Sequence, residues 1–193
     1  MNLRASIVAA IALTTGAAIA AFPGVVRVSG AQAQEAAAPA TATAALAAAN
    51  GAALGTVALT GSPRGGVLMR IEARGLTPGW HGLHFHAKGD CSDAKFEKAG
   101  GHTHGGEKSV HGLLNGAATD TGDLPNLHVG ADGTATVEVY SGLVRLSGGE
   151  PAQNLLDSDG SAVLIHANAD DHTSQPIGGA GARIACGVIK PAR

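Results

Sequence analysis

All nine histidines of this 193-residue chain lie within residues 81–172, and that stretch is where we expect its chemistry. His84 and His86 are separated by one residue in a segment that is typical of a strand end. Because side chains alternate along a strand, the two imidazoles would share one face while Leu83 and Phe85 enter the core. Such a pair is a common arrangement of metal ligands, and a polar surface pair is the alternative interpretation.

Further imidazoles and carboxylates could join this pair. His166 follows the apolar run 163–165, so it would emerge from a buried strand and supply a third nitrogen. A fourth candidate, His102, follows two glycines inside a long loop. The same loop also carries a mixed imidazole and carboxylate set: His111, Asp120 and Asp123. Imidazole suits copper or zinc, and zinc also accepts carboxylate. The residues therefore predict two neighbouring metal sites.

Short strands are the elements that would position these side chains. Period-two alternation runs from Val67 to Arg74, and short apolar runs at 162–165 and 184–189 suit buried strands. Glycine is abundant, at 29 residues, and no stretch of ten residues reads as a credible helix. The pattern predicts an all-β fold, an antiparallel sandwich or barrel.

Two long glycine-rich stretches, at about 87–125 and 168–183, interrupt the strand pattern. Loops of that length are usually either functional or disordered, and the residue content of these two favours function. Cys91 in the first loop and Cys186 near the C-terminus are the only cysteines. In an exported protein a disulfide between them is the default interpretation, and two free thiols are the alternative.

The N-terminal residues 1–33 read as a secretory signal peptide, because Arg4 precedes an apolar run that Pro23 ends. An uncleaved membrane anchor is the alternative, since the run is nearly long enough to span a bilayer. Residues 34–50 are rich in alanine and predict a flexible tether, which leaves 51–193 as the folded domain. The protein would then be periplasmic or secreted, or tethered to the membrane if the segment stays uncleaved.

The charge pattern excludes one class of partner. The chain has 13 lysines and arginines against 15 aspartates and glutamates, a formal net charge of -2, and the cations are scattered along the sequence. A nucleic-acid-binding protein would present a clustered basic surface. We therefore expect no nucleic acid partner.

Five motifs in this order resemble those of a known family, the exported bacterial copper,zinc superoxide dismutases. They are Gly-Leu-His-Phe-His at 82–86, Gly-Asp-Cys at 89–91, Gly-Gly-His at 100–102, Gly-Asp-Leu-Pro at 122–125 and Gly-Gly-Ala-Gly-Ala-Arg-Ile-Ala-Cys-Gly-Val-Ile at 178–189. The resemblance covers about residues 53–190. It implies a Greek-key β-barrel with two long functional loops. It also implies an enzyme that converts superoxide to dioxygen and hydrogen peroxide, protecting the exported compartment.

The resemblance also implies a metal ligand set. Its copper ligands would be His84, His86, His102 and His166. His102 would be shared with a structural zinc, whose other ligands would be His111, Asp120 and Asp123. Asp120 departs from the family pattern, which more often has histidine there. His104 is the other side chain that could substitute as a ligand, and we expect it to face solvent.

Two further residues receive roles from the resemblance. Asp170 would accept hydrogen bonds from His84 and His111 without binding metal, and Arg183 would attract and orient the superoxide anion. His102 would also be catalytic, by taking up and returning a proton. Lysines that could help to attract the anion are Lys88, Lys95 and Lys98. No catalytic role is expected for His81, His128 and His172.

Two points stay open at this level. Relatives include monomers and dimers, so a homodimer is neither implied nor excluded by the resemblance. The alternative function is an exported copper-binding or copper-storage module on the same fold, without efficient turnover.

Overall fold

The computed structural model describes residues 38–103, 109–148 and 154–192. The predicted signal peptide and His104 lie outside these ranges. The strands within them are β1 (Thr41–Ala47), β2 (Ala53–Gly61), β3 (Val67–Arg74), β4 (Gly79–His81), β5 (Leu83–His86), β6 (Leu127–Val129), β7 (Thr134–Ser141), β8 (Ala162–His166) and β9 (Arg183–Pro191), with one 3₁₀ turn, η1 (Glu97–Ala99). No helix in this described part of the chain is long and apolar enough to cross a bilayer.

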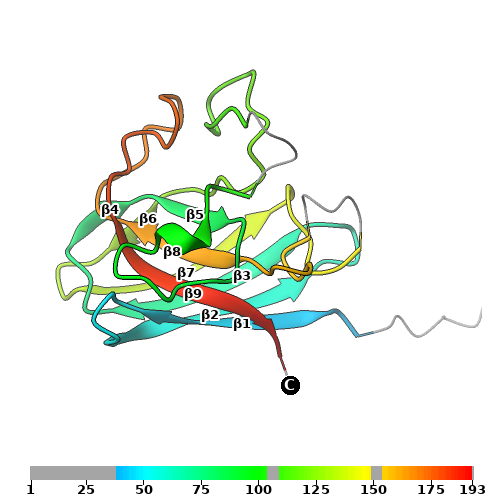
Figure 1. The fold of residues 1–193 in the computed structure, drawn as a ribbon, viewed down its shortest axis with the longest axis horizontal. Helices are drawn as coiled ribbons and strands as arrows, with labels where there is room; N and C mark the ends of the chain where they lie inside the picture. Colours follow the sequence, from blue (N-terminus) through cyan, green and yellow to red (C-terminus); the bar gives the residue numbers. More distant parts are fainter. Residues whose placement is uncertain (1–37, 104–108, 149–153, 193) are drawn as a thin grey trace, which may run out of the picture. The chain divides into compact units, whose positions relative to one another are not determined.

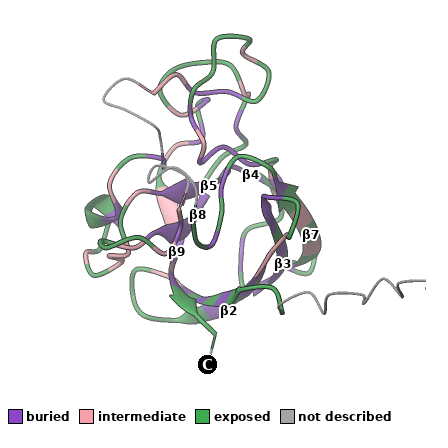
Figure 2. Cartoon of the chain, turned by 90° about the vertical axis from the view of Figure 1, so that its right-hand side faces the viewer, coloured by how far each residue is buried: buried purple, intermediate pink, exposed green. Residues whose placement is uncertain are grey.

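The strands form an antiparallel barrel, as the sequence predicted. Seven of them form one sheet in the order β5-β8-β9-β1-β2-β3-β7, and β4 pairs with β6. The sheet curls around a buried interior, which is seen end-on in Figure 2. Strands far apart in the sequence, such as β5 and β8, are hydrogen-bonded neighbours in this order and lie side by side in Figure 1.

Alternation along β3 shows how the sequence builds this interior. Val67, Met69, Ile71 and Ala73 are buried, while the residues between them are exposed. The strand pairs with β2 on one side from Val67 to Ala73, and with β7 on the other side along its whole length. One face of β3 therefore packs into the core and the other meets solvent.

The prediction of a flexible tether over 34–50 is wrong for Thr41–Ala47. These residues form β1, which pairs with β2 on one side and β9 on the other. Ala42, Ala44 and Leu46 are each only 1% exposed, so the strand buries every second side chain. Pairing on both edges outweighs the weak strand propensity of alanine, and the folded domain begins before residue 51.

Both predicted long loops connect strands that border the metal-ligand candidates. One runs from β5 to β6 and contains η1, and the other runs from β8 to β9. They contact each other, since the backbone N–H of Leu114 donates to the carbonyl of His172 and that of His111 donates to the side chain of Gln175. The predicted disulfide is present between Cys91 and Cys186, with a Cα–Cα distance of 5.9 Å. It joins the first loop to β9.

Candidate metal centre

Strand β5 presents two imidazoles on the face opposite the core. Leu83 and Phe85 belong to the barrel core, while His84 and His86 are fully buried beneath the loops outside it. The predicted alternation is therefore confirmed. The neighbouring strand β8 pairs with β5 in antiparallel register and ends at His166, which lies beside the pair.

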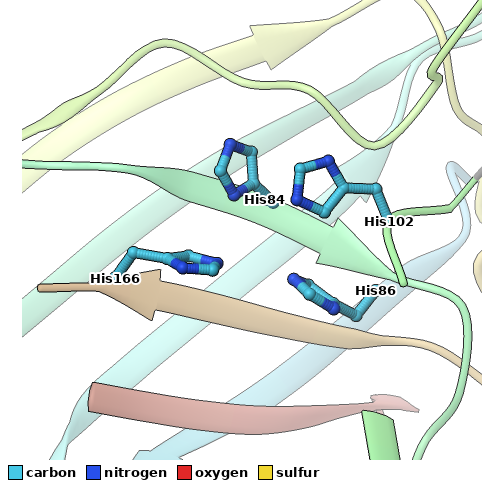
Figure 3. Close-up of side chains that lie close together, drawn as sticks. All are labelled: His84, His86, His102 and His166. Atoms are coloured by element: carbon cyan, nitrogen blue, oxygen red, sulfur yellow. The ribbon is translucent and has the colours of Figure 1, made fainter. Parts of the chain in front are cut away.

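Four imidazoles converge at this point. His102 comes from the first long loop, where it forms an isolated β-bridge with His86. The ring nitrogens that His84, His86, His102 and His166 offer all lie within 4.8 Å of one another. Figure 3 shows the four rings directed toward a common centre from β5, β8 and the loop. All four are at most 5% exposed.

Backbone carbonyls select the protonated nitrogen of two of these rings. His86 Nδ1 lies 3.0 Å from the carbonyl oxygen of Gly100, and His166 Nδ1 lies 3.0 Å from that of Gly181. A carbonyl oxygen only accepts hydrogen bonds, so each Nδ1 must carry the proton. The Nε2 atom of both rings is left with its lone pair.

A carboxylate makes the same choice for His84. Its Nε2 donates to Asp170 Oδ2 at 2.7 Å, which leaves the lone pair on Nδ1. Within the described residues, four buried nitrogens of the cluster have no hydrogen-bond partner: His84 Nδ1, His86 Nε2, His102 Nε2 and His166 Nε2. Buried polar atoms are normally paired, and four convergent imidazole nitrogens form a donor set that suits copper.

A second set of donors meets the other side of His102. His102 Nδ1 lies 2.9 Å from Asp120 Oδ2 and 3.2 Å from Asp123 Oδ1. His111 Nδ1 lies 2.7 Å from the same Asp123 oxygen. His84, His102, His111 and Asp123 form a second group with ligand atoms within 4.8 Å of one another, and Asp120 contacts this group through His102. Two imidazoles and two carboxylates suit zinc.

Asp170 forms hydrogen bonds with one histidine of each set. Its Oδ2 accepts from His84, and its Oδ1 accepts from His111 Nε2 at 3.0 Å. The His111 lone pair is then on Nδ1, which faces Asp123. Gly178 makes this approach sterically feasible, because a Cβ at that position would lie 1.7 Å from Asp170 Oδ1. Such partners of ligand histidines fix ring orientation.

Burial and charge act in opposite directions on these rings. Burial lowers the pKa of His84, His86 and His166, that of His166 to about 3, so these rings stay neutral and able to bind metal. His102 is different. Burial also disfavours its charged form, but the hydrogen bonds and negative charges of Asp120 and Asp123 raise its pKa to about 9. This ring is therefore the most basic of the four.

Arg183 lies beside the copper candidates at the start of β9. Its guanidinium donates to the carbonyl oxygens of Phe96 and Gly100, the latter at 2.6 Å. The Gly100 oxygen also accepts from His86, so one carbonyl joins the guanidinium to the histidine cluster. The positive charge of Arg183 contributes to lowering the pKa of both His86 and His166. Sequence reasoning missed Phe96, because nothing in its residue type marks a carbonyl that binds arginine.

Three other histidines among the described residues, His81, His128 and His172, lie outside the two clusters. Each ring nitrogen of His81 lies 2.7 Å from a backbone carbonyl, one of them that of His166, so this buried ring ties β4 to β8. The ring of His128 packs edge-on against exposed Trp80. His172, in the second loop, has its Nε2 atom 3.2 Å from Nδ2 of Asn126 in the first loop. Of the three candidate lysines, Lys95 lines a surface cavity together with Arg183.

A Greek-key β-barrel that gathers four imidazoles next to a two-histidine, two-carboxylate set defines a dinuclear copper and zinc protein. Comparison with known proteins gives the family. The model of the copper/zinc superoxide dismutase family matches residues 53–189. The chain belongs to this family.

Several relatives agree with this assignment. A superoxide dismutase [Cu-Zn] of Caulobacter vibrioides is 57% identical over 152 residues, which cover 78% of this chain and 86% of the relative. The superoxide dismutase [Cu-Zn] of Escherichia coli strain K12 is 35% identical, over 72% of this chain and 80% of the relative. Among solved structures, a Cu/Zn superoxide dismutase from Brucella abortus superposes with a TM-score of 0.61 at 30% identity, covering 78% and 99% of the two chains.

Proposed function

We propose that this protein catalyses the dismutation of superoxide, in which two superoxide anions and two protons give dioxygen and hydrogen peroxide. The copper would be held by His84 Nδ1 and by the Nε2 atoms of His86, His102 and His166. The observation that carries the proposal is that these four buried nitrogens converge and have no hydrogen-bond partner among the described residues. The same histidine, His102, would reach zinc through Nδ1.

Each metal has a separate task. Copper supplies the one-electron redox chemistry that accepts an electron from one superoxide and returns it to the next, which zinc cannot do. Zinc would be held by His102, His111, Asp120 and Asp123. The two carboxylates would balance the charge of the zinc ion, and Asp170 keeps His84 and His111 in the required tautomers.

His102 and Arg183 would act on the substrate. Superoxide needs a proton as it becomes peroxide, and His102 Nε2 faces the other three copper ligands. The ring would take up a proton at Nε2, in place of copper, between the two half-reactions and return it to the reduced anion, while solvent would supply the second proton of hydrogen peroxide. Arg183 keeps a permanent positive charge next to His86 and orients the incoming anion.

Export of the protein is part of this proposal. Residues 1–33 would serve as a signal peptide, and the periplasm or the extracellular medium would be the destination. The Cys91–Cys186 disulfide supports an oxidising compartment. Cleavage after Ala33 would also leave β1 complete, since the strand begins at Thr41. An uncleaved segment would instead tether the barrel to the membrane. The proposal applies equally to a monomer and to a homodimer.

The test is the rate of superoxide decay catalysed by the metal-reconstituted protein. His166→Ala should lose copper and activity together. Arg183→Ala should retain copper but lose about tenfold or more in rate, because a charged, preorganised donor is removed. His128→Ala is the control, because the ring of His128 packs against Trp80 and belongs to neither cluster, and its activity should match that of the wild type. A copper-storage module, which the comparisons do not favour, would bind copper fully and show no turnover in the wild type.

A further inference from the structure

The first long loop, whose carbonyl groups accept hydrogen bonds from the Arg183 side chain, contains a phenylalanine in an unusual backbone conformation. Phe96 has φ 57° and ψ 27°, in the left-handed region that non-glycine residues seldom adopt. Its carbonyl oxygen is one of the two that accept hydrogen bonds from the Arg183 guanidinium. One of the two carbonyl groups that hold Arg183 therefore belongs to the residue with the strained conformation.

The ring of Phe96 is one of the contacts that anchor this segment to the barrel. Phe96 is only 3% exposed and packs in a small cluster on the outer face of the sheet, together with Ala99, Ala162, Leu164 and Cys186. Figure 1 shows η1, directly after Phe96, in front of β8. Burial of an aromatic ring offsets the cost of a left-handed residue.

The hydrogen bonds of Asp93 shape the turn, whose two ends are attached to the barrel by the Cys91–Cys186 disulfide and by the bond from His86 to the Gly100 carbonyl. Asp93 side-chain oxygens accept the backbone N–H groups of Lys95, Glu97 and Lys98, and the carbonyl of Asp93 accepts that of Phe96. These bonds all run between neighbours in sequence. Between these two attachments, the contact of the Phe96 ring with β8 and β9 holds the middle of the turn against the sheet.

We propose that Phe96 is a positioning residue for Arg183. Its ring docks the turn against the outer face of β8, and this docking aims the Phe96 carbonyl at the guanidinium. Without the Phe96 carbonyl, the guanidinium would keep only the Gly100 carbonyl as a backbone acceptor. Its position relative to His86 would then be less restricted. For catalysis this inference rests on the proposed function, but the geometry can be tested without turnover.

The first test measures how firmly the guanidinium is held. The rate of phenylglyoxal modification at Arg183, read by peptide mass spectrometry on the metal-loaded protein, should rise about threefold in Phe96→Ala. Phe96→Leu keeps an apolar anchor and should stay near the wild-type rate. Exposed Arg64 and Arg70 serve as internal references, and Leu114→Ala, at an exposed apolar position of the same long loop, is the control that should leave the rate at Arg183 unchanged. An unchanged rate at Arg183 in Phe96→Ala would overturn the proposal.

The second test separates positioning from general destabilisation. Phe96→Ala should lower kcat/KM for superoxide by roughly tenfold in the wild-type background, since misplacing a binding group is costly. In the Arg183→Ala background the same substitution should have no further effect, because Phe96 acts through Arg183. Equal losses in both backgrounds would contradict the proposal. Phe96→Gly should be as impaired as Phe96→Ala, because glycine relieves the backbone strain without restoring the ring.

Two outcomes need a further measurement: a variant that does not fold, and a wild-type protein without turnover. If Phe96→Ala does not fold, as judged by thermal unfolding, Phe96→Val replaces it in both measurements. If the wild-type protein shows no turnover, the proposed function fails, but the modification rate at Arg183 still decides whether Phe96 holds the guanidinium.

Discussion

At the scale of single residues, the centre is defined by which nitrogen of each ring carries the proton. The ligand types and the shared face of His84 and His86 could be predicted from their spacing on a strand. The choice of ligand atom could not, because it depends on backbone carbonyls at Gly100 and Gly181 and on the carboxylate of Asp170. The direction of a backbone carbonyl cannot be predicted from the residue type, so it is known only from the folded structure.

Asp170 gives the sharpest residue-level prediction. It accepts hydrogen bonds from one ring of each metal set, and Asp170→Asn replaces one acceptor oxygen with a donor that faces an N–H group. We expect the affinity for both copper and zinc to fall by about 10–100-fold, measured by competition with chelators. Asp171→Asn, at the exposed neighbouring position, is the control. Wild-type affinities in Asp170→Asn would show that the carboxylate does not orient the ligands.

At the scale of elements, strands with strong alternation could be predicted and one weak strand could not. Val67–Arg74 combines large apolar residues with charged ones, so its two faces differ clearly. In Thr41–Ala47 the exposed face carries threonine and alanine and the buried face carries alanine and leucine, which gives little contrast between the faces. Its strand state comes from pairing with β2 and β9, and β9 lies more than a hundred residues away in sequence.

Strand β1 can be tested by two substitutions on its opposite faces. Leu46 is 1% exposed in the barrel core, so Leu46→Ala should lower the free energy of unfolding by about 2–5 kcal/mol. Thr43 lies on the exposed face, and Thr43→Ala should change it by no more than about 0.5 kcal/mol. Chemical denaturation of the metal-free proteins measures both values. Equal, small effects would restore the tether interpretation.

At the scale of the whole molecule, the charge distribution opposes the substrate. The formal net charge of -2 repels an anion, so positive charge must be concentrated near the centre. Arg183 and Lys95 line one surface cavity, but Glu97 lines it too. The overall sign of charge could be read from composition, whereas this local balance depends on how the first long loop folds over β8.

The lysines of that loop carry the corresponding prediction. Replacing Lys88, Lys95 and Lys98 together by glutamine should lower the second-order rate constant for superoxide and flatten its dependence on ionic strength, because salt screens their attraction. Pulse radiolysis across a salt series measures both. As a control that removes equal charge, the triple change of Arg64, Arg70 and Arg74 to glutamine alters β3 and the turn before it. If both triple variants behave alike, local attraction by the lysines is ruled out.

The most direct measurement of the central claim is anomalous X-ray scattering at the copper and zinc absorption edges, from crystals of the metal-loaded protein. We predict a copper peak between His84 Nδ1 and the Nε2 atoms of His86, His102 and His166. A zinc peak should lie on the other side of His102, in contact with both Asp120 and Asp123. A copper peak away from these four nitrogens would contradict the account.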